Sequence, residues 1–195
     1  MKIAVLDTET TGLKSKKHEI LEIACILYEF SDDGSKKIVK TFEKKVRPRN
    51  LGVAEPKALE VNGYSDEKWV NSVDFSEIYD EICQIFENSD LLMGQNLIFD
   101  LKFIQSECNR RNLNKIDFPA YIDTKAMADE LKKANWIHST SLDNLISHYK
   151  IVIEGRAHTA LCDCERTMAV FEKLCLDLDN DYHLYTFDSP YYRRR

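Results

Sequence analysis

Two acidic side chains near the N-terminus have the spacing of metal ligands. Asp7 and Glu9 directly follow the apolar run Lys2–Leu6. Side chains alternate along a strand with period two, so both carboxylates would project to the same side of a strand end. Carboxylate oxygens that share one side are suited to hold a divalent cation. For this pair alone, two acidic loop residues in water are an equally weighted alternative.

Two further aspartates lie one turn inside expected helices. Asn96 can cap a helix that begins at Leu97, which places Asp100 at the edge of an apolar stripe that faces the core. Thr159 can likewise cap the last helix and puts Asp163 on a stripe of Val and Leu. A carboxylate that points toward protein is costly unless it is paired, hydrogen-bonded or bound to a cation. Each aspartate therefore needs a partner, and a salt bridge to a nearby arginine or lysine is the alternative to a cation.

His158 is the histidine best placed to act on a water molecule. It precedes the last helix and lies five residues before Asp163, a separation that places it on a loop. A loop imidazole can swing toward a water, and its ordinary pKa lies close to working pH, as a general base requires. Taken alone, a single histidine is more often a surface or hydrogen-bonded residue.

The patterns around these residues predict an α/β architecture. Strands are expected over residues 2–6, 20–30, 38–46, 90–94 and 121–123, and helices over residues 75–87, 97–112, 141–149 and 159–176. Three antiparallel strands followed by alternating helices and strands indicate a mixed β-sheet flanked by helices. We expect one domain, residues 1–176, and a C-terminal extension, residues 177–195, that is peripheral or mobile.

Composition narrows the class of protein. The 195 residues carry a formal net charge of -6, whereas a protein that grips duplex backbone by bulk electrostatics would usually be strongly basic. Any contact with nucleic acid must then be local. Six cysteines without a CxxC pair indicate reduced core thiols and not a zinc site. With no apolar stretch that suits a signal peptide or a membrane span, we expect a cytoplasmic protein without membrane contact.

Three motifs in this order resemble the DnaQ-like DEDDh 3′-to-5′ exonucleases, which include proofreading subunits and RNase T. They are LDTETTG at residues 6–12, NLIFDLKF at residues 96–103 and HTALCD at residues 158–163. The resemblance extends over nearly the whole chain and implies an RNase H-like fold. It also implies an exonuclease that releases nucleoside 5′-monophosphates from a nucleic acid with a free, single-stranded 3′ end.

The same resemblance assigns roles to the acidic residues and the histidine. Two Mg²⁺ or Mn²⁺ ions would bind Asp7, Glu9, Asp100 and Asp163, with His158 as the general base that deprotonates the attacking water. Two cations about 4 Å apart can stabilise the attacking and leaving oxygens of an in-line displacement at phosphorus.

The resemblance further points to a pocket for the terminal nucleotide. Its residues would be Thr10, Gly12, Leu13, Asn62, Gly63, Asn96 and Phe99. Apolar and aromatic side chains there could stack on splayed bases without regard to base sequence. Core packing is an equal alternative for Leu13 and Phe99. Asn62 and Gln95 stand where many relatives carry histidine, and Asp123 is expected to be structural.

Two alternatives stay open. A HAD-type phosphatase would use Asp7 as a nucleophile, but it needs aspartate at the position of Glu9 and leaves residues 158–163 without a role. A non-catalytic module on the same fold would use its groove only to hold a nucleic-acid end. The sequence does not decide between DNA and RNA, between proofreading, repair and RNA processing, or whether a polymerase or another protein binds.

Overall fold

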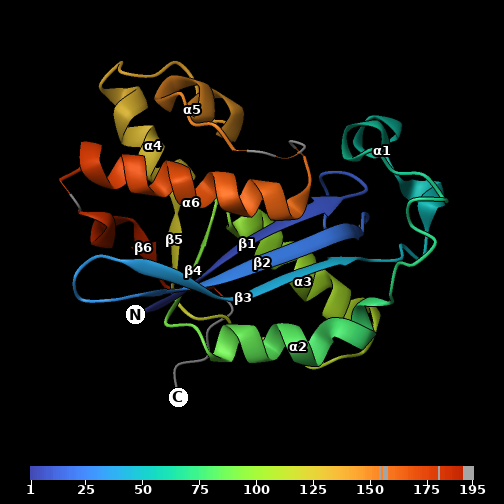
Figure 1. The fold of residues 1–195 in the computed structure, drawn as a ribbon. Coiled ribbons are helices and arrows are strands. Elements are labelled where there is room, and N and C mark those ends of the chain that lie inside the picture. Colours follow the sequence, from blue (N-terminus) through green and yellow to red (C-terminus); the bar gives the residue numbers. More distant parts are fainter. Residues whose placement is uncertain (154, 156–157, 180, 191–195) are drawn as a thin grey trace.

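A six-stranded mixed sheet separates two layers of helices in the computed structural model, which describes residues 1–153, 155, 158–179 and 181–190 (Figure 1). The strands lie in the order β3-β2-β1-β4-β5-β6. Strands β1 to β3 form an antiparallel meander, β4 and β5 run parallel to β1, and β6 is antiparallel to β5. Their bounds are β1 Lys2–Thr10, β2 Ile20–Phe30, β3 Lys36–Lys45, β4 Leu91–Gly94, β5 Tyr121–Asp123 and β6 Thr186–Phe187.

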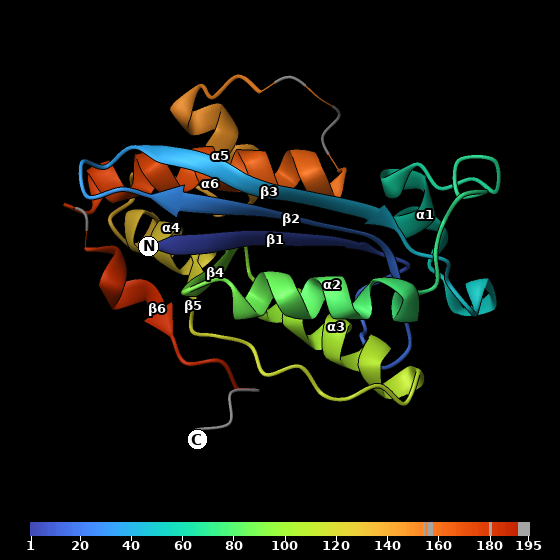
Figure 2. The same ribbon diagram turned by 60° about the horizontal axis from the view of Figure 1, so that its bottom comes forward.

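The helices cover both faces of this sheet. Helices α2 and α3 lie on one face, while α6 packs on the other with α4 and α5 beside it; α1 lies beyond the ends of β1 and β2 (Figures 1 and 2). The bounds are η1 Leu51–Val53, α1 Pro56–Asn62, α2 Phe75–Glu87, α3 Ile98–Arg110, α4 Thr124–Lys133, α5 Leu142–Tyr149, α6 Ala160–Asp177 and η2 Tyr182–Tyr185. Among the described residues, none of the helices is long and apolar enough to cross a membrane.

The alternation of side chains along β1 fixes which way its acidic end points. Ala4 and Leu6 pack into the core on the α2 and α3 side, whereas Ile3 and Val5 pack into the core beneath α6. Because β1 continues unbroken to Thr10, residues 7 and 9 share the face of Ile3 and Val5. The carboxylates of β1 therefore lie on the side of the sheet that α6 covers.

The architecture confirms the predicted mixed sheet with antiparallel strands first, parallel strands next and helices on its faces. Two helices were not predicted. Helix α4 buries Thr124, Met127, Ala128 and Leu131, a spacing that carries a helical signal in the sequence. Helix α1 has seven residues and buries only Asn62, so no apolar stripe marks it.

The C-terminal segment contributes to the sheet. After α6 the chain forms η2 and then β6, whose residues pair with Tyr121 and Ile122 of β5. Part of the expected extension is thus an edge strand, and residues 180 and 191–195 lie outside the described part of the chain. The boundary after residue 176 stays a prediction.

Asp123 joins α4 to the turn that leads into α3. Its side chain, 9% exposed, accepts hydrogen bonds from the backbone N–H of Lys125 at 2.9 Å and of Asn96 at 2.9 Å. It caps α4 and fixes the turn four residues before Asp100. The contacts agree with the structural role expected for Asp123.

We predict that Asp123→Ala lowers the free energy of unfolding by about 1–3 kcal/mol, because two partly buried backbone donors lose their acceptor. Urea denaturation measures the change. Asp129→Ala on the same helix is the control, since its exposed pair with Lys125 is expected to contribute less than about 1 kcal/mol. Equal losses in the two variants would contradict the anchoring role of Asp123.

Candidate functional site

Asp100 is fastened to the acidic end of β1. Its carboxylate, 3% exposed in the first turn of α3, accepts hydrogen bonds from the Thr8 backbone N–H at 2.9 Å and the Thr8 hydroxyl at 2.6 Å. Both bonds end on Oδ1. Among the described residues, the partner of the buried Asp100 carboxylate is therefore Thr8, and not a basic side chain. Thr8 lies between the two acidic residues of β1.

The start of α6 brings an imidazole and a further carboxylate to the same end of β1. Possible ligand atoms of Glu9, His158 and Asp163 all lie within 4.8 Å of one another. His158 is exposed and precedes α6 with a left-handed backbone, φ 62°, while Asp163 is 7% exposed in the first turn of the helix. Residues about 150 positions apart in the chain thus meet at one place.

Asp7 is not part of that group of three, but it lies within their electrostatic reach. Burial is the main cause that raises the pKa of Asp7 well above its usual range, and the charges of Asp100, Glu9 and Asp163 add to it. Burial, with Asp163 next, raises the pKa of Glu9 to about 8. Burial also raises the pKa of Asp100 to about 7 against the opposing bonds from Thr8. The cluster has an excess of negative charge that a bound cation would relieve.

Asp163 has a basic partner. Its Oδ1 accepts a hydrogen bond from Nη1 of Arg166 at 2.7 Å, and Arg166 also contacts Asp143 of α5. The ion pair weighed for this aspartate from the sequence is therefore present. The bridge engages one carboxylate oxygen and leaves Asp163 within the group formed with Glu9 and His158.

A pocket of about 400 Å³ opens beside the acidic cluster. Five of the seven residues predicted for a terminal nucleotide line it, namely Thr10, Gly12, Leu13, Asn62 and Phe99. Leu13 is 75% exposed, so core packing does not explain it. Phe99 is partly buried and stacks on Phe103 with 4.7 Å between ring centroids. Phe99 therefore both lines the pocket and packs against the core.

Gly63 and Asn96 are not among the residues that line this pocket. Gly63 ends α1 in a left-handed conformation, and Asn96 donates its backbone N–H to Asp123. The cap expected from Asn96 is wrong, because the N-cap position of α3 is Leu97 and no side chain caps that helix. Thr159 does occupy the N-cap position of α6, but its side chain makes no capping hydrogen bond.

The sequence interpretation missed the α1 side of the pocket. Glu55, Lys57, Ala58 and Val61 line it, and the side chain of Asn62 ties α1 to β1 by donating to the Thr10 carbonyl at 2.9 Å. These residues could have been found only if α1 had been predicted. They place one acidic and one basic group beside the apolar lining.

Gly12 is required by close packing at the pocket wall. A Cβ atom at this position would lie 2.4 Å from Nδ1 of His18 and 2.9 Å from Cδ of Glu55. His18 is fully buried, and its Nδ1 accepts the backbone N–H of Lys14 at 3.0 Å. The histidine, which has no evident role in the sequence, supports the loop that carries Gly12 and Leu13.

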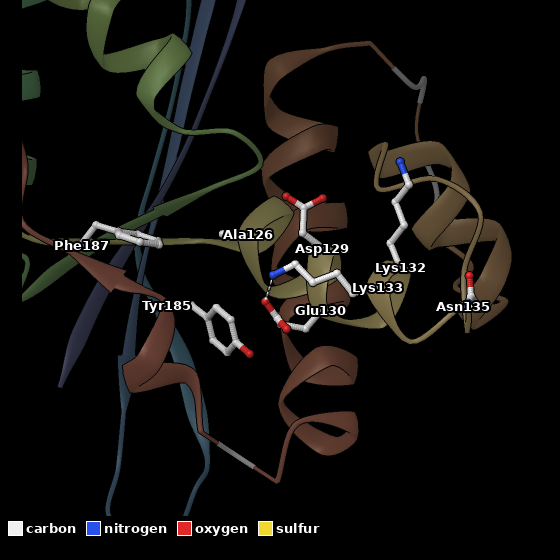
Figure 3. Close-up of a pocket in the computed structure, with 8 residues that line it drawn as sticks. All are labelled: Ala126, Asp129, Glu130, Lys132, Lys133, Asn135, Tyr185 and Phe187. Carbon is white, nitrogen blue, oxygen red and sulfur yellow. Dashed lines mark hydrogen bonds and ion pairs between the residues drawn. The ribbon is translucent and has the colours of Figure 1, made fainter.

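A second hollow, of about 710 Å³, lies between α4 and the C-terminal segment (Figure 3). Its acidic groups are Asp129, which pairs with Lys125, and Glu130, which pairs with Lys133; Tyr185 and Phe187 close the other side. With its carboxylates matched by lysines, this hollow lacks the unbalanced negative charge of the cluster at β1. The smaller pocket is the better candidate site.

Comparisons with known proteins place the chain in a family. Residues 4–171 match the model of the RNase_T family, described as exonuclease. The DNA polymerase III subunit epsilon of Treponema pallidum is 27% identical over 168 residues, which cover 85% of this chain and 72% of the relative. The ribonuclease T of Shewanella denitrificans is 28% identical over 184 residues, which cover 86% of this chain and 77% of the relative.

Solved structures share the fold. The nuclease domain of 3′hExo, a DEDDh family member bound to rAMP, superposes with a TM-score of 0.72 at 18% identity, covering 92% of this chain and 94% of that domain. This chain spans 64% of the length of another solved neighbour, cell-death related nuclease 4 (CRN-4).

The raised carboxyl pKa values predict a stability that falls as pH rises when no cation is present. In the folded protein Glu9 holds its proton up to about pH 8, whereas an unfolded chain releases it near 4.5. The Asp100 carboxyl likewise holds its proton up to about pH 7 in the folded protein, whereas an unfolded chain releases it near pH 3.8. Between these limits the folded state binds more protons, so the free energy of unfolding decreases with pH, and the loss is complete above the folded pKa.

Thermal unfolding in a chelator at pH 5 to 9 measures this decrease. We expect Glu9→Gln to raise Tm at pH 8, and added Mn²⁺ to raise the Tm of the unaltered protein at the same pH. Glu87→Gln, an exposed change on α2, is the control. A Tm that is constant across the range, or that Glu9→Gln lowers, would contradict the account.

Proposed function

Because the chain belongs to the exonuclease family whose model matches its residues 4–171, we propose that it removes nucleotides one at a time from a 3′ end and releases nucleoside 5′-monophosphates. The family match confirms the resemblance to the DEDDh 3′-to-5′ exonucleases, and the fold is RNase H-like, as in those proteins. The direction of digestion, the residues that act and the products of the reaction form the proposal.

One observation supports the proposal above the others. Possible ligand atoms of Glu9, His158 and Asp163 lie within 4.8 Å of one another, and Glu9 also lines the pocket of about 400 Å³. A phosphodiester held between that pocket and the carboxylates would lie beside both the candidate metal ligands and the imidazole. The arrangement suits hydrolysis of the bond that joins the terminal nucleotide to the chain.

The donor set fits hard divalent cations. It consists of carboxylates and one imidazole, without a thiolate, and oxygen donors suit Mg²⁺ and Mn²⁺. We assign the binding of two such ions to Asp7, Glu9, Asp100 and Asp163. When bound, the ions would supply positive charge for the attacking and leaving oxygens of the displacement. The thermal stabilisation by Mn²⁺ described above tests this binding without reference to activity.

His158 is assigned the proton transfer. Its exposed side chain can reach solvent water, and a ring nitrogen lies within 4.8 Å of carboxylate oxygens of Glu9 and Asp163. His158 has a left-handed backbone just before α6, and its imidazole lies near Glu9 of β1.

The pocket accounts for a preference for chain ends. Leu13 lines the pocket from the segment after β1, and Ala58 and Val61 line it from α1. A splayed base can stack on Leu13 or Phe99 without regard to its sequence. In this arrangement the terminal sugar and base enter the pocket, and α1 blocks a continuing strand.

The substrate is assigned as a nucleic acid with a free single-stranded 3′ end. The similar proteins include a DNA polymerase subunit, a ribonuclease, and E. coli exonuclease I solved with a dT13 oligonucleotide. These names span DNA and RNA, so the sugar is left to experiment. The first of these names, a DNA polymerase subunit, is the basis for proposing a polymerase as a partner.

A specific contact favours a second candidate, a module that holds a 3′ end without cleaving it. The bridge from Arg166 to Asp163 occupies one oxygen of a proposed ligand. If the bridge persisted when substrate binds, that carboxylate would be poorly available to a cation. The family match gives no such support to the phosphatase alternative.

Digestion of single-stranded and duplex DNA and RNA, labelled at the 5′ end, tests the proposal. With Mg²⁺ or Mn²⁺ we expect a descending ladder of products on at least one substrate, and no products in a chelator. Binding without turnover under either metal would favour the end-holding module. A single internal cut would contradict exonuclease action.

Substitutions test the assigned residues. Asp7→Ala, Asp100→Ala and His158→Ala are expected to lower kcat by about 100-fold or more, because each removes a proposed ligand or the base. His148→Ala, exposed on α5, is the matched control for the histidine. Circular dichroism checks the fold of every variant. An unchanged rate in either aspartate variant would count against the assignment.

A further inference from the structure

Glu22 is a buried carboxylate outside the proposed ligand set. It is 5% exposed on β2, and its Cα pairs directly with that of Glu9 on β1. It shares the face of Ala24 and Ile26, which pack beneath α6. Acidic side chains directly opposite each other on neighbouring strands repel, and burial adds to this cost. A buried acid at this position therefore needs a compensating contact.

The compensating contact is with the first residue of α6. The backbone N–H of Ala160 donates to Oε1 of Glu22 at 3.1 Å, across 138 positions of sequence. Glu22 therefore supplies an acceptor for this helix terminus from another strand. A negative charge is also favourable beside the positive end of the helix dipole.

Two residues of β3 flank this carboxylate. Lys45 is the Cα partner of Glu22, and its positive charge lowers the pKa of Glu22, whereas a hydrogen bond with the Glu43 side chain raises it. Burial is the largest cause and raises this pKa. Glu22 thus lies between the acidic cluster on β1 and one lysine on β3, with its Oε1 directed at α6.

The position of Ala160 makes this contact relevant to the site. His158 lies two residues before it and Asp163 three residues after it, and both come within 4.8 Å of Glu9. The left-handed backbone of His158 is uncommon for a residue other than glycine and persists only where its surroundings fix it. A bond that anchors the next turn of chain to β2 supplies such a restraint.

We infer that Glu22 is a positioning residue, which holds the start of α6 so that His158 and Asp163 face Glu9. The inference rests on the proposed function for its effect on catalysis. Glu22 does not contact the reacting atoms in this assignment. Glu22 contributes one side-chain oxygen that is placed to accept a hydrogen bond. Glutamine, whose amide oxygen also accepts, can therefore replace it, whereas alanine cannot.

Hydrogen exchange of the Ala160 amide tests the contact without any assay of activity. By NMR, we expect protection of this amide in the unaltered protein and in Glu22→Gln, and exchange at least about tenfold faster in Glu22→Ala. The amide of Met168, in the middle of α6, is the internal control for the fold of the helix. Equal protection of Ala160 in the alanine variant would overturn the inference.

Steady-state kinetics test the consequence. For Glu22→Ala we expect kcat to fall by about 10- to 100-fold with KM within about twofold, because misplacement of the base and one ligand affects the chemical step more than end binding. For Glu22→Gln we expect kcat within about threefold of the unaltered protein. An equal loss in both variants would show that charge matters and not acceptor geometry, and would overturn the inference.

Glu172→Ala is the matched control variant. Glu172 lies toward the other end of α6 and pairs with Lys36 of β3, so its loss removes a second carboxylate contact between α6 and the sheet. We expect its kcat to be unchanged. A loss as large as that of Glu22→Ala would overturn the inference by making the effect general to α6. If the unaltered protein hydrolyses no substrate, the proposed function fails, while the exchange of Ala160 still decides the contact.

Discussion

Repulsion among partly and fully buried carboxylates is the constraint on which the rest of the structure depends. Asp7, Glu9 and Asp100 all have raised pKa values, chiefly from burial, and the charges of neighbouring carboxylates add to this effect. A chain gains nothing in stability from such a cluster unless a cation or shared protons relieve it. The sheet and the helices packed on it must therefore hold these carboxylates in place against their mutual repulsion.

Main-chain donors fix several carboxylates in and around this cluster. Thr8 contributes its backbone N–H and its hydroxyl to Asp100, Ala160 contributes its backbone N–H to Glu22, and Asn96 and Lys125 do so to Asp123. Backbone groups are fixed by secondary structure, so they orient a carboxylate with little loss of side-chain entropy. The same bonds join β1 to α3, β2 to α6, and the turn after β4 to α4. The polar connections of the site are also connections of the fold.

The sequence predicted what depends on local periodicity and missed what depends on distant partners. The period of two along β1 correctly placed Asp7 and Glu9 on one face, and the helix periods located α2, α3, α5 and α6 within a few residues. The apolar stripe of α4 is present in the sequence but was not used to predict a helix. Helix α1 has no apolar stripe from which it could be predicted. The caps were the weakest point, because α6 takes its acceptor from Glu22 on a strand 138 residues away. No local pattern marks such a contact, and the same holds for the bridge from Arg166 to Asp143.

The backbone of His158 limits how this position can vary. At φ 62° the chain adopts a conformation that asparagine and glycine tolerate and that β-branched residues strongly disfavour. Asparagine would keep the path of the chain while removing the imidazole, whereas valine or isoleucine would also displace the start of α6. Side-chain chemistry and chain geometry can therefore be varied separately here, and descendants that lost the base would most easily retain the shape of the site through asparagine or glycine.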